Sequence, residues 1–216
     1  MKLGPSTAKL LELGSEPLIP SSESVDLGTL EGMGGSYHEL ASALRAKNGF
    51  YAFESALHVF PWEGLGTISG IQEWNSDSGW RSEYGHLAHG CLFFAEDAFG
   101  GQFCLKDGSA WQFDPETGDL SLLGASLEEW AQAVLSDFEF LTGHTVASQW
   151  QVANGALPAG ERLVPRVPFV LGGEFSMSNL VLMDSERGMR IRGGLATQIN
   201  SLPEGAQIRF VIDGDN

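Results

Sequence analysis

Residues 91–123, CLFFAEDAFGGQFCLKDGSAWQFDPETGDLSLL, decide the fold. Short runs rich in aromatic and branched residues alternate in this stretch with turn signals. Asp107-Gly108 is typical of a tight hairpin, and residues 114–118 combine a proline, which presets φ, with a glycine that accepts positive φ. Consecutive strands joined by such short turns pair antiparallel. The sequence therefore predicts a four-stranded antiparallel meander.

Helices are predicted on both sides of the meander. Residues 125–143 begin with Ser126 and Glu129 at capping-box spacing, and their apolar residues recur at helical spacing. Residues 35–49 have the same pattern, with Ser36 and Glu39 at the start and Asn48-Gly49 at the end. Two helical turns are expected within residues 67–85, whereas residues 50–66 fit neither period. The predicted class is α+β, an antiparallel β-meander packed with helices.

Charge and composition narrow the functional classes. The 216 residues are 43% hydrophobic, which is enough for a packed core, and carry a formal net charge of −16. A basic face for nucleic acid or anionic lipid is not expected, because phosphates would be repelled. We read no signal peptide and no membrane span. Two cysteines cannot form a disulfide framework, so a reducing, cytoplasmic location is predicted.

The distribution of charge suggests three segments. Residues 1–142 hold 6 basic and 21 acidic side chains, net −15, while residues 143–216 hold 6 and 7, net −1. We predict an N-terminal segment over 1–30 with a helical turn in 7–13, a domain over 31–142, and a β-rich extension over 143–216. In the extension, strands are expected over 179–184, 188–192 and 206–213, and a helix over 195–203. The prolines within 162–171 favour an edge strand or an extended connection.

Chemical motifs are weak. The Glu96-Asp97 pair is the sharpest polar feature, but adjacent strand residues point to opposite faces, so one carboxylate is expected to brace the following turn instead of sharing a reaction. His86, His89 and Cys91 have a spacing that suits a metal, yet a fourth ligand is missing, and loop histidines beside a buried thiol explain them better.

Two other features also have a structural explanation. The glycine-rich run 32–36 lacks the lysine of a phosphate loop, so it is interpreted as a flexible lead into a helix. In the predicted hairpin, Cys104 faces about residue 93, so Cys104 and Cys91 are diagonal and no disulfide is expected. No cofactor is predicted. The tryptophans at 62, 74, 80, 111 and 130 are expected in the core, although those at 62, 74 and 80 also suit surface anchors.

Residues 31–142 resemble the SUKH superfamily. The pattern is a strand that ends in an acidic pair and an FG turn, an aromatic strand, a D-x-E-T-G turn and a helix with a tryptophan. The matching positions are Asn48, Gly49, Trp74, Asn75, Phe94, Glu96, Asp97, Phe99, Gly100, Phe103, Trp111, Phe113, Asp114, Thr117, Gly118, Leu127 and Trp130. The usual Leu-Pro before the first helix is replaced by residues 33–35. Residues 157–184 are similar to the C-terminal part of type VI secretion immunity proteins.

The resemblance implies a non-enzymatic immunity protein that neutralises a secreted bacterial toxin. The acidic surface suits a basic toxin domain, because charge complementarity speeds association. Exposed acidic candidates for partner binding are Glu63, Glu73, Asp77, Glu83, Glu128 and Glu129. One alternative is a regulatory interaction module without a toxin, as in the fungal relatives. The other is an acid/base or metal enzyme that uses Glu96, Asp97, His86 or His89. The sequence predicts no oligomeric state.

Overall fold

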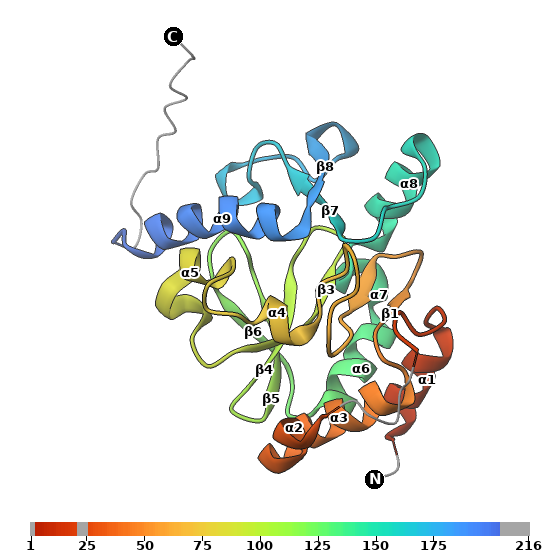
Figure 1. Ribbon diagram of the computed structural model, residues 1–216. Coiled ribbons are helices and arrows are strands. Elements are labelled where there is room, and N and C mark those ends of the chain that lie inside the picture. Colours follow the sequence, from red (N-terminus) through yellow and green to blue (C-terminus); the bar gives the residue numbers. More distant parts are fainter. Residues whose placement is uncertain (1–2, 21–25, 204–216) are drawn as a thin grey trace.

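A six-stranded antiparallel sheet forms the centre of the molecule (Figure 1). The computed structural model describes residues 3–20 and 26–203. The strands follow one another in the order of the sequence: β1 (Phe50–Ala52), β2 (Leu57–Val59), β3 (Leu92–Asp97), β4 (Gln102–Lys106), β5 (Ser109–Phe113) and β6 (Leu120–Gly124). The last four are the predicted meander, so the α+β class is confirmed.

Strands β1 and β2 lie within residues 50–66, whose apolar pattern matches neither helical nor strand periodicity. They pair as a hairpin, with Tyr51 opposite His58. The turn between them places Phe53, Glu54 and Ser55 at φ of 52°, 53° and 67°. Side chains rarely take this left-handed conformation, and turns that need it usually contain glycine or asparagine. The hairpin therefore has no conventional turn signal in its sequence.

The β3–β4 register is the expected one. Phe93 lies opposite Cys104, and a bulge follows between Phe93 and Ala95. Cys91 and Cys104 are both buried and free. Phe93 and Phe94 contact opposite layers, since Phe93 lies 4.9 Å from the Trp80 ring and Phe94 4.8 Å from the Trp130 ring. Helices therefore cover both faces of this part of the sheet.

Seven helices precede the C-terminal segment within the described residues. They are α1 (Pro5–Leu13), α2 (Gly28–Met33), α3 (Gly35–Ala46), α4 (Ile71–Trp74), α5 (Arg81–Tyr84), α6 (Leu127–Ser136) and α7 (Phe138–Leu141), with a 3-10 turn η1 (Gly85–Ala88) after α5. The two turns expected in residues 67–85 are α4 and α5. The single helix expected within residues 125–143 is divided into α6 and α7 at Asp137, which has φ −144°.

Carboxylates cap several of these helices, and some of them come from a different helix than the one they cap. Ser126 accepts a hydrogen bond from the Glu129 backbone N–H, as expected, and the Glu129 side chain accepts from Ala125. The capping box predicted at Ser36 is wrong, because Gly34 caps α3 and the Ser36 hydroxyl donates to the Gly108 carbonyl.

Glu39, the other half of that predicted box, caps a different helix. It projects from α3 and accepts hydrogen bonds from the backbone N–H groups of Leu127 and Glu128 at the start of α6, at 3.0 and 3.3 Å. A negative charge is favourable at this end of a helix. The contact therefore joins α3 to α6.

The C-terminal segment is more helical than expected. It contains α8 (His144–Asn154), β7 (Glu161–Pro165), η2 (Phe169–Leu171), η3 (Met177–Asn179), β8 (Leu180–Asp184) and α9 (Ser185–Asn200). Strand β8 confirms the strand predicted over 179–184, and β7 pairs with it antiparallel. The strand predicted over 188–192 is wrong, because Asp184 accepts from the Arg187 N–H, 2.8 Å away, and starts α9. The strand predicted over 206–213 lies outside the described residues.

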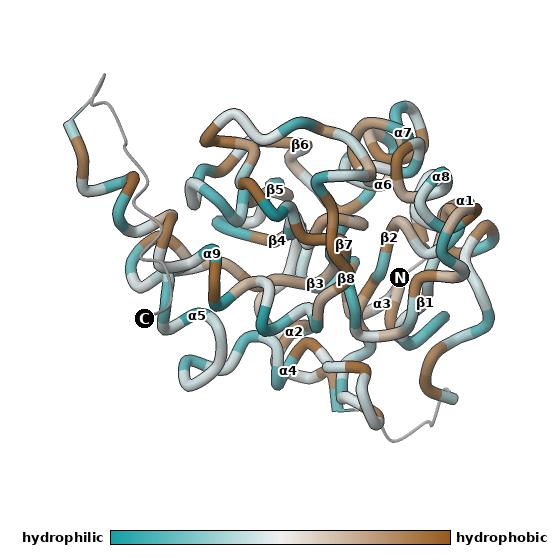
Figure 2. The backbone as a smooth tube through the Cα atoms, turned by 90° about the horizontal axis from the view of Figure 1, so that it is seen from above, coloured by the Kyte–Doolittle hydropathy of each residue, from teal (hydrophilic) through white to brown (hydrophobic). Residues whose placement is uncertain are grey.

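The three predicted segments share one core. Leu10 of α1 and Met189 and Ala196 of α9 belong to the same buried cluster as Phe93 and Trp130. Figure 2 shows β7 and β8 lying over the large sheet near the centre of the view, and the Leu163 N–H donates to the Ala98 carbonyl. The boundaries near residues 31 and 142 stay a prediction, and contacts cross both of them.

Candidate functional site

The turn between β3 and β4 is built around Asp97. Its Oδ1 accepts hydrogen bonds from the backbone N–H groups of Phe99 and Gly101, each at 2.8 Å. Gly100 has φ +77°, a conformation that favours glycine. As predicted, one member of the Glu96-Asp97 pair braces the turn, and that member is Asp97.

The turn between β5 and β6 uses a second carboxylate in the same way. Asp114 Oδ1 accepts from the backbone N–H groups of Glu116 and Thr117, at 2.7 and 3.3 Å. Glu116 then reaches the C-terminal segment, where its Oε2 accepts from the Val170 N–H at 2.8 Å. Gly118 has φ +76° and completes the turn. The D-x-E-T-G motif therefore fixes both a turn and a contact between distant parts of the chain.

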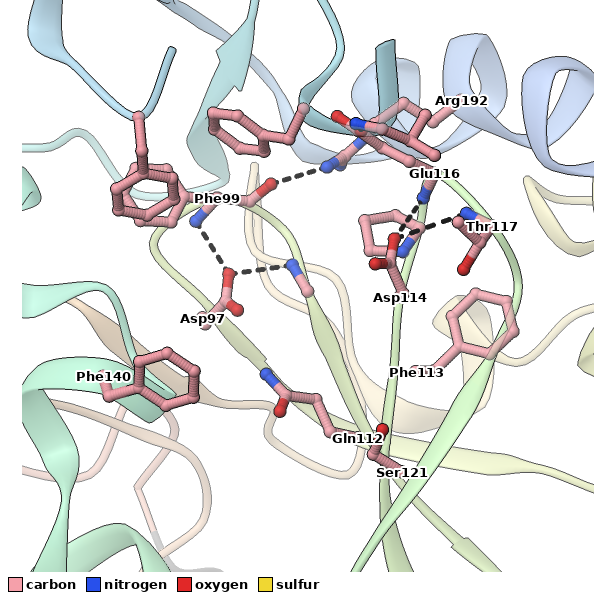
Figure 3. A pocket seen from close by; sticks show the side chains of 15 residues that line it. Asp97, Phe99, Gln112, Phe113, Asp114, Glu116, Thr117, Ser121, Phe140 and Arg192 are labelled. Atoms are coloured by element: carbon pink, nitrogen blue, oxygen red, sulfur yellow. Dashed lines mark hydrogen bonds between the residues drawn. The ribbon is translucent and has the colours of Figure 1, made fainter. Parts of the chain in front are cut away.

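These two turns line a pocket of about 430 Å³ against the C-terminal segment (Figure 3). Its volume is within the range of small-ligand sites. The polar lining includes the carboxylates of Asp97, Asp114 and Glu116. Two lining residues, Phe140 and Phe175, are 79% and 57% exposed. The pocket thus combines acidic groups with aromatic surface that the core does not use.

The aromatic lining is continuous on the side of the C-terminal segment. The Phe175 ring lies 4.8 Å from Phe99 and 4.9 Å from Phe169, measured between ring centroids. Phe99 belongs to the β3–β4 turn, whereas Phe169 belongs to η2. The aromatic wall therefore exists only when the C-terminal segment is packed on the sheet.

Arg192 from α9 supplies the positive charge of the pocket. It is 4% exposed, and its Nη1 and Nε donate to the carbonyls of Phe99 and Gly188 at 2.7 and 3.0 Å. Among the described residues no carboxylate lies within salt-bridge distance of it. Backbone carbonyls therefore hold the guanidinium in place, and it offsets only part of the negative charge around it.

Burial changes the ionisation of two pocket acids. It raises the pKa of Asp97 to about 7, against the opposing effects of its two backbone hydrogen bonds and of Arg192. Burial also raises the pKa of Glu116, although the hydrogen bond from Val170 opposes the rise. Perturbed carboxyls in a cleft mark candidate functional sites. Here Asp97 also stabilises its own turn, and Glu116 also joins the β5–β6 turn to η2 through Val170.

Glu96 lies in a different environment, inside the protein. Its Oε1 is 3.1 Å from His58 Nδ1, 3.0 Å from Arg162 Nε and 3.3 Å from Ser185 Oγ, and its Oε2 is 3.4 Å from Gln102 Nε2. Glu96 is 1% exposed and Arg162 is fully buried. Arg162 holds the pKa of Glu96 below its ordinary value despite burial. Burial lowers the pKa of His58 to about 4, so the imidazole is neutral at physiological pH.

This cluster follows a row across the sheet. Tyr51, His58, Glu96 and Gln102 occupy directly opposed positions on β1 to β4, and Trp74 Nε1 donates to Gln102 at 2.8 Å. The C-terminal segment contributes Arg162 and Ser185 to the contacts of Glu96. Buried Tyr51 Oη, His58 Nε2 and Arg162 Nη2 have no hydrogen-bond partner within the described residues. At the centre of this cluster, the buried ion pair between Glu96 and Arg162 joins β7 to the sheet.

Most other motif residues are also structural. Asn48 Oδ1 accepts from the Trp62 N–H, and Gly49 has φ +73°. Asn75 exchanges two hydrogen bonds with the Phe93 backbone. The remaining apolar motif residues of the sheet and α6 pack in or against the core: Phe94, Phe103, Trp111, Phe113, Leu127 and Trp130. The tryptophans at 62, 74 and 80 are buried as well, so the core interpretation is confirmed.

The structure divides the acidic candidates for partner binding. Glu63 is exposed, and Asp77 has a 97% exposed side chain 4.0 Å from Arg81. Glu83 lies 3.7 Å from Arg190. Three of the six candidates cap helices or turns.

Glu73, Glu128 and Glu129 are these three. Glu73 accepts from the N–H groups of Gly64 and Gly70. Glu128 is half-buried and accepts from the N–H groups of Ser6 and Thr7 at the start of α1. The prediction that Glu128 is an exposed acid for partner binding is wrong as to its exposure, because the carboxylate accepts hydrogen bonds at the start of α1.

His86, His89 and Cys91 do not form a site with other ligands. His86 lies in η1 and His89 follows it, while Cys91 is buried. Among the described residues no three His, Cys, Asp or Glu side chains are grouped so that they could hold a metal ion. Nor does any described helix have the length and hydrophobicity needed to cross a membrane.

Most residues that line the pocket are not among the predicted site residues. Arg192 was assigned to a strand, and Glu116, Phe140, Phe169 and Phe175 were not singled out. Glu116 lies inside the recognised D-x-E-T-G turn, so its position was an available signal. The others come from segments whose approach to the turn depends on the tertiary fold.

Comparison with known proteins supports the fold. No model of a known protein family matches the chain, and no curated protein matches it. Among solved structures, the chain is similar to Atu4351 from Agrobacterium tumefaciens, with 14% identity and a TM-score of 0.56, over 87% of each chain. At this identity the similarity concerns the fold alone. It places the molecule among α+β proteins with this arrangement, and the SUKH resemblance stays a prediction.

Proposed function

We propose that this chain is a non-enzymatic immunity protein that acts in the cytoplasm and neutralises a secreted bacterial toxin by binding it. The observation that carries the proposal is the pair of exposed aromatic side chains, Phe140 and Phe175, at a pocket that also contains three carboxylates. Exposed apolar surface with polar residues around it is typical of protein interaction sites, and aromatic residues are frequent anchors there.

The positions of the acidic pairs support binding over catalysis. Acid–base catalysis by a pair of carboxyls needs both of them to face one reacting bond. Glu96 is enclosed by His58 and Arg162, whereas Asp97 belongs to the pocket and braces its own turn. The acidic surface suits a basic partner, since complementary charge raises the association rate.

Binding to the products of the adjacent reading frames tests the proposal. The chain should bind one of them and restore growth when that protein is expressed as a toxin. Replacing both Phe140 and Phe175 with serine should weaken binding about 30-fold, as expected for the loss of an aromatic anchor. Leu122→Ser is the matched control, because Leu122 is 58% exposed and is not part of the pocket lining. Absence of binding and protection with all adjacent products would contradict the proposal.

Salt dependence tests the role of the acidic surface. Asp77→Asn should slow association at low salt and have little effect at high salt, because screening shortens the range of the interaction. Glu73→Gln should change stability as well, since Glu73 accepts two backbone hydrogen bonds. An association rate that is insensitive to salt and to Asp77→Asn would place the docking surface elsewhere.

A further inference from the structure

We infer that the pocket between the β3–β4 turn, the β5–β6 turn and η2 binds a cationic side chain, a lysine or arginine of the protein partner. The inference rests on the proposed function for the source of that side chain. Its chemistry comes from the pocket itself, which has three carboxylates, a phenylalanine lining and one fixed guanidinium.

Formal charge favours a cation over an anion, and a bound cation would counter the effect of burial, which raises the pKa of both Asp97 and Glu116. Asp97, Asp114 and Glu116 are opposed by Arg192 alone among the charged residues that line the pocket. Arg192 is 4% exposed and is directed to the carbonyls of Phe99 and Gly188. It is therefore not presented as a receptor for an anion.

Glu116 provides an independent observation. Its side chain is 4% exposed and lines the pocket. While Oε2 accepts from Val170, Oε1 is buried without a hydrogen-bond partner among the described residues. A buried acceptor without a donor is unfavourable, and an ammonium or guanidinium group in the pocket would supply the missing donor.

The aromatic residues suit the rest of such a side chain. Lysine and arginine carry an apolar stem and a charged end, and cations are attracted to the faces of aromatic rings. Phe99, Phe169 and Phe175 form a contiguous group beside the carboxylates. Phe140 lines the pocket from α7 (Figure 3). The stem would contact the rings while the charged end reaches the acids.

The test uses three small probes with the full-length protein: N-acetyl-lysine methylamide, its uncharged norleucine analogue and N-acetyl-glutamate methylamide. Binding is followed by the backbone amide NMR signals of Phe99, Gly101 and Val170. We expect saturable shifts with the lysine probe, and binding of the norleucine analogue about tenfold weaker or undetectable.

Matched variants locate the binding. Glu116→Gln and Asp97→Asn keep an oxygen that can accept the backbone hydrogen bonds, and each should weaken binding of the lysine probe several-fold. Asp119→Asn removes a charge from the same turn outside the pocket lining and should leave binding unchanged. Thermal melting of each variant checks its folding.

The outcomes separate the two proposals. Preferential binding of the glutamate probe, equal binding of lysine and norleucine probes, or no localised shift up to the solubility limit would overturn the cationic pocket. The proposed function would still stand if an adjacent product binds. Conversely, a lysine probe that binds as described would support the pocket even if all adjacent products fail to bind.

Discussion

Glu96 and Asp97 are neighbours in the chain but belong to opposite environments. Glu96 is 1% exposed and is enclosed by His58, Arg162 and Ser185, whereas Asp97 lines a pocket beside exposed aromatic rings. The alternation of side chains along a strand produces this separation. One acidic pair therefore contributes one residue to the interior and one to a candidate binding surface.

The difference also appears in the pKa of each group. A buried charge is tolerated when a counter-charge accompanies it, and Arg162 keeps Glu96 ionised. Arg192 lies near Asp97 but is held by carbonyls, and burial raises the pKa of Asp97 to about 7. The ionised form is thus stabilised in the interior and disfavoured at the pocket.

The largest expected effect comes from breaking the interior pair. Glu96→Gln leaves Arg162 buried without a counter-charge and should lower the free energy of unfolding by about 3–5 kcal/mol. Urea denaturation measures the loss. The double variant Glu96→Gln/Arg162→Met removes both charges and should recover part of it. Equal stability of Glu96→Gln and the wild type would mean that the pair is not a stabilising contact.

The pH dependence of stability separates the contributions of Asp97 and His58. Because the pKa of Asp97 rises from 3.8 to about 7 on folding, its contribution falls as pH increases from about 4 to 7. Because the pKa of His58 falls from 6.5 to about 4 on folding, its contribution to stability rises as pH increases from about 4 to 6.5.

Asp97→Asn removes only the first contribution. The free energy of unfolding of this variant, relative to wild type, should therefore rise with pH between about 4 and 7. This difference changes by about 1.4 kcal/mol for each pH unit in which Asp97 is protonated in the folded wild type but ionised in the unfolded chain. Urea denaturation at several pH values measures it, and a difference that does not vary with pH would place Asp97 in an ordinary ionised state.

The backbone of the β3–β4 turn gives a smaller effect. Gly100→Ala places a side chain at φ +77° with its Cβ 2.5 Å from Arg192 Nη2, and should cost about 1–3 kcal/mol. Gly194→Ala is the control, since its Cβ would meet no atom within 4 Å. If both variants melt at the same temperature, the turn does not require glycine and the pocket wall is more adaptable than the contacts indicate.

The smallest expected effect concerns a carboxylate that is neither interior nor in the pocket. Glu128→Ala removes the cap of α1 and should cost about 0.5–2 kcal/mol. Glu139→Ala, an exposed acid on α7, should change stability by less than about 0.5 kcal/mol. Thermal denaturation compares them. A loss in Glu139→Ala as large as in Glu128→Ala would point to general charge effects instead of capping.

The parts of the fold that could be predicted from the sequence are those set by local patterns. The meander, its register at Phe93 and Cys104, and the bracing role of an acid at the end of β3 follow from the turn residues and the strand periodicity. The β1–β2 hairpin was not recognised because its turn has three non-glycine residues at positive φ. The capping-box spacing of Glu39 also gave a wrong prediction, because Glu39 lies at the position that would cap its own helix but caps α6 instead.

The site was less predictable than the sheet. Asp97, Phe99 and Asp114 were named from the motif, and they line the pocket. Arg192 and Arg162 depend on how the C-terminal segment packs, and nothing in their local sequence indicates a buried guanidinium. Residues 188–192 alternate in a way that suggests a strand, and the Asp184 cap that starts α9 outweighs this pattern.

Arg162 has a consequence for synthesis on the ribosome, where chains grow from the N-terminus. The meander and its flanking helices can emerge while β7 is still missing. During that interval Glu96 has neither Arg162 nor Ser185 beside it, and the polar row on β1 to β4 is incomplete. The nascent sheet therefore contains an acid without its counter-charge until β7 and α9 have been synthesised, so a later part of the chain completes the interior of an earlier part.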